Sequence, residues 1–316
     1  MKIKKNFITL TAIFIFSLTA CQKDIIPETP PMPTATLSAD SNYLSKSILI
    51  DISGSSIDSF ITSYNYDNLK RVSNVVDITK SNTATNSEKD SIIYFYNGSD
   101  TTPIKKYDYY EYFGNYSAKD TSMSFFNYNS LNQLIKDSTI EFKKTPSNYT
   151  ILKRVSNYTY VLNKIYGVTV STILYSTINS FQPYIQRDTA TLDANKNIIN
   201  SRQQTIVGTT SPTIENKIYT FTYDNKPSPY LNQNINYIFP NIPEGSTDYI
   251  YDQIGSKNNR LTSNEVSITS GGTGSYFGDF TGKYIYKSNG YPSSIFIPDP
   301  SFPTDFSKFI FIYKTL

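Results

Sequence analysis

The stretch "YNYDNLKRV" at residues 64–72 decides the fold, because it has the pattern of a β-hairpin corner. Tyr64 and Tyr66 flank one polar residue, which is the two-residue period of a strand. Asp67 begins a polar run of the kind that stabilises tight turns, and Val72 resumes the apolar pattern. The stretch therefore predicts two antiparallel strands joined by a turn, and not a chemical site.

Partial copies of this corner recur along the chain. In each copy an alternating aromatic stretch closes at one residue, here called the anchor, and turn residues follow it. Successive anchors lie 28 to 35 residues apart; they are Tyr66, Tyr96, Tyr128, Tyr160, Leu192, Tyr223, Tyr251 and Tyr286. Each unit of about 32 residues has room for two strands, so the repeat predicts about sixteen antiparallel strands in total.

The composition agrees with an all-β fold. The 316 residues include 28 Tyr and 19 Phe, and aromatic and β-branched side chains suit a pleated surface. We expect one large antiparallel meander of hairpin repeats over residues 41–316. An open sheet of this width accumulates twist and exposes two edges, so we expect it to be curved or barrel-like.

The composition also excludes several kinds of chemistry. The chain has no His and one Cys, Cys21, so it lacks His-based catalysis, disulfides and thiolate metal clusters. Asp193 opens a stretch with some oxygen donors of a calcium loop, but the pattern fits a hairpin turn better. We therefore expect no enzyme, no cofactor and no metal. A carboxylate-dependent glycosidase stays open, with Asp108 and Glu111 as the acid pair to inspect.

The N-terminus is predicted to be an export signal. Three lysines precede a short apolar run, and residues 1–20 end before Cys21. The segment Leu18-Thr19-Ala20-Cys21 resembles the lipobox of bacterial lipoproteins. That resemblance implies cleavage before Cys21, acylation of its thiol and attachment to the outer membrane, on its periplasmic or cell-surface face. Residues 21–40 are rich in proline and are expected to form an extended tether.

The charge balance gives no support to nucleic-acid binding. The formal net charge of +3 equals the number of lysines in residues 1–20, so the mature chain would be neutral. A nucleic-acid surface needs concentrated basic residues.

A family resemblance follows from the anchors. The stretches "YNYDNLKRVSNV", "TLDANKNIIN" and "YIYDQIGSKNNRLTSNEV" resemble YD (RHS-type) repeats. They are more similar to Bacteroidetes lipoproteins of a domain-of-unknown-function family described as porin-like in fold. The resemblance implies a β-rich exported protein, and it brings no catalytic residues.

These observations predict a non-enzymatic, lipid-anchored protein that binds a glycan or a protein partner. The candidate ligand-binding residues are Tyr107, Tyr109, Tyr110 and Tyr112, because rows of tyrosine rings can stack on sugars. The alternative is a membrane-inserted β-barrel. Lys, Asp and Asn near the centres of most predicted strands argue against insertion, because a lipid-facing surface must be nearly free of charge.

Overall fold

The computed structural model describes residues 42–81, 87–113, 119–144, 149–175, 178–207, 213–233, 256–269, 275–299, 302 and 304–316. These residues belong to the second of two units into which the chain divides, Met1–Leu37 and Ser38–Leu316. Cys21, the predicted signal and the whole of the tether lie outside the described residues, as does the anchor Tyr251. Within the described ranges, no helix is long and apolar enough to cross a membrane.

The described residues form a meander of antiparallel strands. The strands are β1 (Tyr43–Ser53), β2 (Ser56–Tyr66), β3 (Val72–Ser81), β4 (Ser87–Tyr96), β5 (Pro103–Phe113), β6 (Lys119–Tyr128), β7 (Leu134–Lys144), β8 (Tyr149–Val161), β9 (Lys164–Tyr175), β10 (Ile178–Leu192), β11 (Ile198–Val207), β12 (Thr213–Pro227), β13 (Asn258–Thr269), β14 (Ser275–Thr281), β15 (Lys283–Tyr286), β16 (Pro292–Pro298) and β17 (Phe306–Lys314). The all-β prediction is confirmed.

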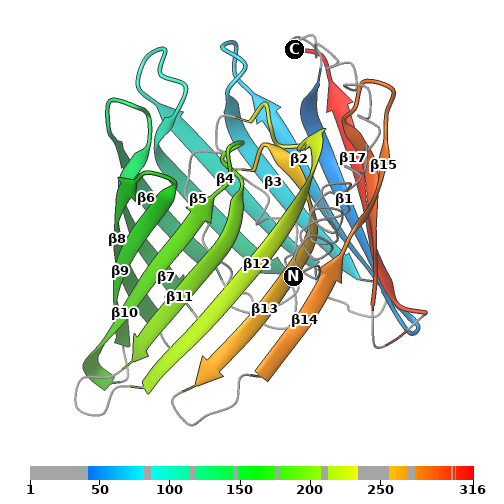
Figure 1. Cartoon of the computed structure of the whole chain (residues 1–316). Helices are drawn as coiled ribbons and strands as arrows, with labels where there is room; N and C mark the ends of the chain where they lie inside the picture. The colour runs from blue at the N-terminus through cyan, green and yellow to red at the C-terminus, as the bar shows by residue number, and fades with distance from the viewer. Residues whose placement is uncertain are drawn as a thin grey trace, which may run out of the picture. The chain divides into compact units, whose positions relative to one another are not determined.

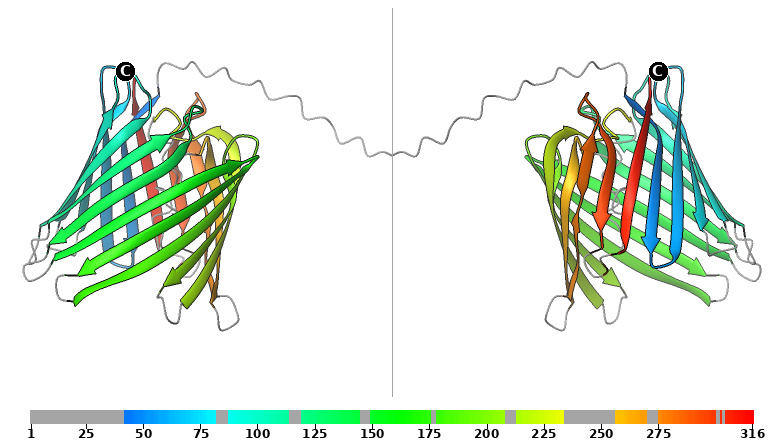
Figure 2. Two further views of the ribbon diagram at one scale, coloured as in Figure 1. Left: turned by 90° about the vertical axis from the view of Figure 1, so that its left-hand side faces the viewer. Right: turned by 90° about the vertical axis from the view of Figure 1, so that its right-hand side faces the viewer.

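The sheet curls into a nearly closed barrel, which Figures 1 and 2 show from three sides. β17 pairs with β1, so the last strand returns to the first. β14 and β15 are consecutive in sequence and together occupy the position of one strand in the barrel. β14 pairs with β13 on one side, and β15 pairs with β16 on the other. The barrel therefore has 16 strand positions, as the repeat predicted.

The described anchors gather at one end of the barrel, here called the anchor end. Strands β2, β4, β6, β8, β10 and β12 finish there, and β1 starts there. The two-residue turn at Gly54 lies at the other end, here called the far end. One repeat is thus one hairpin of the meander.

The opening stretch forms a tight turn that uses its own side chains. The backbone N–H of Lys70 donates to the carbonyl of Asp67 at 3.0 Å, and Lys70 has a left-handed φ of 61°. The Asp67 carboxylate accepts the backbone N–H groups of Leu69 and Arg71, each at 2.9 Å. This is a type I turn followed by a left-handed residue, a common hairpin connection.

The same turn recurs at three more corners. Asn129, Asp193 and Lys287 take the place of Asp67, and the left-handed residues are Asn132 at 56°, Lys196 at 70° and Gly290 at 85°. Asp193 accepts hydrogen bonds from the backbone N–H and side-chain amide of Asn197, at 2.8 and 2.9 Å. The hairpin interpretation of "DANKN" is therefore confirmed.

Tyrosine hydroxyls tie strand ends together at the anchor end. The Tyr96 hydroxyl, at the end of β4, donates to the carbonyl of Val72 at the start of β3, at 2.6 Å. Equivalent bonds of 2.8 to 3.0 Å join Tyr66 to Leu44, Tyr128 to Pro103, Tyr160 to Leu134 and Tyr223 to Ile198. Leu192, the anchor without a hydroxyl, packs instead against the second apolar cluster.

Arg71 connects neighbouring turns. Its guanidinium pairs with Asp67 at 2.7 Å, donates to the carbonyls of Gly98 and Asp100 at 2.7 and 2.8 Å, and lies 4.2 Å from the Tyr96 ring centre. Burial alone would raise the pKa of Asp67, but the hydrogen bonds from Arg71 and Leu69 outweigh it and hold that pKa below its usual value. The Tyr66-Asp67-turn-Arg71 stretch is therefore a structural joint.

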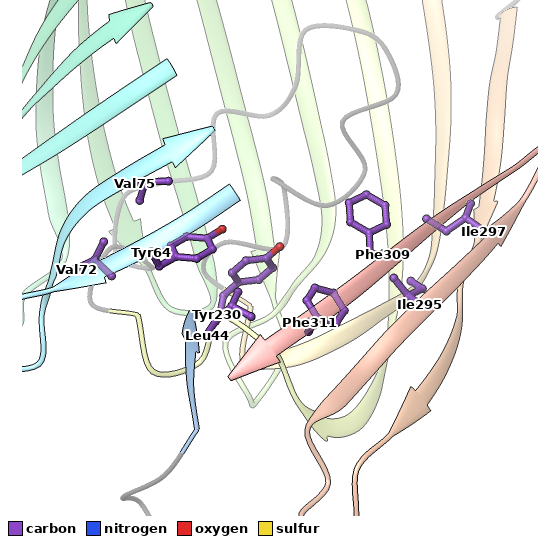
Figure 3. Close-up of a cluster of buried hydrophobic side chains, with 9 residues drawn as sticks. All are labelled: Leu44, Tyr64, Val72, Val75, Tyr230, Ile295, Ile297, Phe309 and Phe311. Carbon is purple, nitrogen blue, oxygen red and sulfur yellow. The ribbon is translucent and has the colours of Figure 1, made fainter. Parts of the chain in front are cut away.

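Two apolar clusters lie on the inner face; the second lies near the anchor end, and the first extends from there to Ile297 near the far end. One cluster contains Leu44, Tyr64, Val72, Val75, Tyr230, Ile295, Ile297, Phe309 and Phe311 (Figure 3). A second contains Phe126, Leu134, Tyr158, Ile165, Ala190, Tyr219 and Phe221. Tyr230 follows β12 and packs edge-on against Phe311, with ring centres 6.4 Å apart. The segment after β12 therefore lies against the inner wall of the barrel.

Candidate functional site: the inner face and its recess

The strand register assigns every strand residue to the inner or the outer face, because directly paired residues share a face. Phe309 and Phe311, which pack with Tyr230, fix the inner face at β17. From there the pairing leads through β1 to an inner row across six strands, made of Thr62, Asp77, Asp90, Tyr110, Asp120 and Lys143.

Acidic residues outnumber basic residues on the described inner face. The acids are Asp51, Asp58, Asp77, Glu88, Asp90, Asp108, Asp120, Asp137, Glu141, Asp188 and Glu265, and the bases are Lys106, Lys143, Arg154, Lys217 and Arg260. Such an excess creates a negative potential inside the barrel. Anions are therefore disfavoured there.

The outer face is rich in exposed apolar side chains. Four isoleucines pair directly across β17, β1, β2 and β3: Ile310, Ile48, Ile61 and Ile78. Large apolar side chains that are more than a third exposed continue around the outside; they include Ile57, Ile93, Phe95, Phe125, Ile140, Phe142, Val155, Val168, Val170, Ile285, Phe296 and Ile312. A single-domain protein in water rarely exposes so extended an apolar surface.

Lysines and aromatic rings flank this apolar surface near the strand ends. Lys80, Lys89 and Lys144 lie on the outer face toward the far end. Toward the anchor end, the Lys105 ammonium lies 4.8 Å from the ring centre of Phe95 and 5.9 Å from that of Phe125. Long basic side chains and aromatic rings are favoured where a membrane meets water.

The sequence-based argument against membrane insertion needs correction. It counted charges near strand centres without knowing their face, and the structure turns most of the acidic ones inward. Asp77, Asp90 and Asp137 are examples. Outward charges remain away from the strand ends at Lys153, Arg187 and Arg202, on β8, β10 and β11.

A recess of about 480 Å³ opens on the inner wall of β4 to β8. Its lining includes Asp90, Lys106, Asp108, Tyr110, Asp120, Ser122, Ser124, Thr139, Glu141, Lys143 and Arg154. Two ion pairs order it: Lys106 with Asp108 and Lys143 with Glu141, each at 2.9 Å. Ser122 also donates to Asp108, at 2.8 Å. Its volume is in the range of small-molecule sites.

The structure separates the four tyrosines predicted to bind a ligand. Alternation along β5 places Tyr107 and Tyr109 on the outer face, and the positions of Tyr110 and Tyr112 on the inner face. They do not form one row: Tyr110 lines the recess, whereas Tyr107 and Tyr109 lie on the opposite face of β5. The two faces of β5 also separate Asp108, inside, from Glu111, outside, so these two acids cannot act on one bond.

The sequence reasoning missed the residues of the recess other than Asp108 and Tyr110. Asp90, Asp120 and Arg154 lie on three different strands and share no motif. The sequence could have indicated them only through strand alternation, because each lies an even number of residues from an aromatic residue of the inner face. Among the described residues, no group of three or more Cys, Asp or Glu side chains is arranged to hold a metal ion.

The barrel places the protein in the porin-like fold class. A porin-like protein from Bacteroides vulgatus matches 87% of this chain and 100% of its own, with a TM-score of 0.53 and 11% identity. A porin-like protein from Bacteroides uniformis covers 87% of this chain and 98% of its own, with a TM-score of 0.41 and 13% identity.

At these identities the first likeness shows the fold alone. No family model matches the chain, and no curated protein is similar to it. The YD-repeat relationship and the lipoprotein anchor therefore stay predictions.

Proposed function

We propose that the protein is an outer-membrane β-barrel whose apolar outer face contacts lipid and whose polar inner face encloses a water-accessible space. One observation carries this proposal: the outer row Ile310, Ile48, Ile61 and Ile78 is apolar, while the neighbouring inner row contains Asp77 and Asp90. A barrel in water places its apolar side chains inside, whereas a barrel in lipid has the reverse arrangement.

The length of the strands agrees with insertion. β1, β2, β5 and β7 each contain 11 residues, and a membrane-spanning strand needs about 9 to 11 residues. The strand-end lysines and aromatic rings would lie at the two membrane surfaces. Acylation of Cys21 would add a second attachment, and the protein would have no enzymatic activity.

A barrel that stays in water, tethered by an acylated Cys21, is the second candidate. The outer side of β10, β11 and β12 favours it. Arg187 is exposed there, and Arg202 and Gln204 each donate to Asn216 at 3.2 Å. Charged and amide groups in this position would be costly against lipid.

Removal of the lipid anchor distinguishes the two candidates. Residues 1–21 would be replaced by a cleavable secretory signal without a lipobox, and the cell membranes would then be washed with alkaline carbonate. An inserted barrel stays in the membrane pellet and enters the detergent phase on phase separation. Release of a folded protein into the wash would refute insertion and support the tethered candidate.

A further inference from the structure

We propose that the recess on the inner wall of β4 to β8 binds an uncharged, hydroxyl-rich ligand, namely a short neutral oligosaccharide. The inference depends on the barrel and its register, and not on whether the barrel is in lipid. The recess lies beyond the apolar layer of the anchor end: Phe126 belongs to the second apolar cluster, and Ser124, two residues along β6, lines the recess.

Two ion pairs occupy four of the charged side chains of the recess, and the remaining three, Asp90, Asp120 and Arg154, are of both signs. Asp108 is held by Lys106 and Ser122, and Glu141 is held by Lys143. Because these side chains already have partners, a charged ligand would have to displace them or remain next to like charges. The compensation favours a ligand without net charge.

The recess nevertheless contains hydrogen-bond acceptors and donors that the described residues do not use. One carboxylate oxygen of Asp90 and one of Asp108, both Oδ1, are buried and have no hydrogen-bond partner among the described residues. Arg154 offers guanidinium donors and forms no ion pair with any other described residue. A buried acceptor without a donor is costly, so these oxygens require donors from water or a ligand.

Sugar hydroxyls fit this mixture of groups, because each hydroxyl can donate to a carboxylate and accept from a guanidinium. Ser124 and Thr139, whose hydroxyls lie 2.8 Å apart, form a polar boundary of the recess. Tyr110 adds a ring against which an apolar sugar face can pack. The acidic excess on the rest of the inner face disfavours anionic sugars.

Isothermal titration calorimetry on the full-length mature protein in detergent micelles tests the proposal. The probes are maltotriose, cellotriose, xylotriose and chitotriose, with trigalacturonate as the anionic comparison and spermine as the cationic one. We expect saturable binding of at least one neutral trisaccharide, and weaker binding of trigalacturonate and spermine.

Two inner-face variants and one outer-face control locate the site. Asp90→Asn and Arg154→Gln each remove hydrogen bonds from a charged group, so each should weaken binding about 10- to 100-fold. Arg187→Gln lies on the outer face and should bind as the wild type does. Far-ultraviolet circular dichroism would verify that each variant keeps its β structure.

Three results would overturn the proposal. They are the absence of binding by every neutral trisaccharide, tighter binding of spermine or trigalacturonate, and unchanged affinity in both folded inner-face variants. The same titrations with protein folded in detergent-free buffer separate this test from that of membrane insertion. Binding without insertion would support the recess while refuting the lipid-facing outer surface.

Discussion

Ile61→Arg tests the lipid-facing surface at its centre. Ile61 is the middle one of five outer-face positions on β2, and it pairs with Ile48 on one side and Ile78 on the other. Asn65 lies four residues further along the same face. At about 3.4 Å per residue this is about 14 Å along the strand, or about 10 Å along the membrane normal for a strand tilted by about 40°.

This geometry sets the expected magnitudes. The apolar band of such barrels is about 25 Å tall, so Ile61 would lie near its midplane and Asn65 near its edge. Arg at the midplane costs about 2 to 4 kcal/mol, but about 0 to 1 kcal/mol near the surface. Ile61→Arg should therefore lower the free energy of unfolding by about 2 to 4 kcal/mol relative to Ile61→Ala, and Asn65→Arg should be nearly neutral.

Urea titration of the protein folded into lipid vesicles measures these differences. The Ile61→Ala variant accounts for the packing that the isoleucine side chain loses in either environment. If the outer face contacts water, an added arginine there changes stability by only about 0.5 kcal/mol. Equal stabilities of the Arg and Ala variants at position 61 would refute the reasoning.

Three further predictions concern the joints of the barrel. Tyr96→Phe removes the hydroxyl that donates to Val72 at 2.6 Å and should cost about 1 kcal/mol in a urea titration, whereas Tyr166→Phe on the outer face should cost almost nothing. Asp67→Asn should destabilise at pH 7 by about 1 kcal/mol. The pKa of Asp67 is lower in the folded protein than in the unfolded chain, where it is near 3.9. The ionised carboxylate therefore stabilises the fold above about pH 4, and the stability difference between Asp67→Asn and wild type should shrink as the pH falls below 4. A pH-independent difference would exclude the ionic contribution. Gly167→Ala should cost about 1 to 3 kcal/mol, because an added Cβ would meet the Tyr158 ring at 3.2 Å; an unchanged urea midpoint would contradict this.

The hairpins could be predicted from sequence because their determinants are local. A turn such as Asp67 to Arg71 is specified by a carboxylate that bonds its own backbone and by a residue that tolerates positive φ. The same residues recur at Asp193 to Asn197. Length and spacing then fixed the number of strands, and the difficulty of leaving two edges open favoured curvature.

The assignment of faces could not be predicted, because strand alternation has the same period whichever face is inside. In β2 the sequence shows Ile61 next to Thr62, and this is compatible with a core inside or with lipid outside. The closed ring, with β17 on β1 and with Phe309 and Phe311 packed on Tyr230 inside it, decides which residue faces inward. The tyrosines of β5 show the consequence, because the predicted ligand-binding row is divided between the outer and the inner face.

The recess was beyond sequence reasoning for a related reason. Asp90 and Arg154 meet the same recess only because four strand pairings lie between β4 and β8 in a fixed register. A shift of one residue in any of these pairings would move one of the two side chains to the outer face.

A nitroxide scan along β2 measures most directly whether the outer face contacts lipid. Single cysteines at residues 57 to 65, in a protein that lacks Cys21, would carry spin labels in reconstituted vesicles. We predict high oxygen and low nickel-chelate accessibility at odd-numbered positions, with a maximum ratio at 61. High nickel-chelate accessibility at 57, 59, 61 and 63 would contradict a lipid-facing surface.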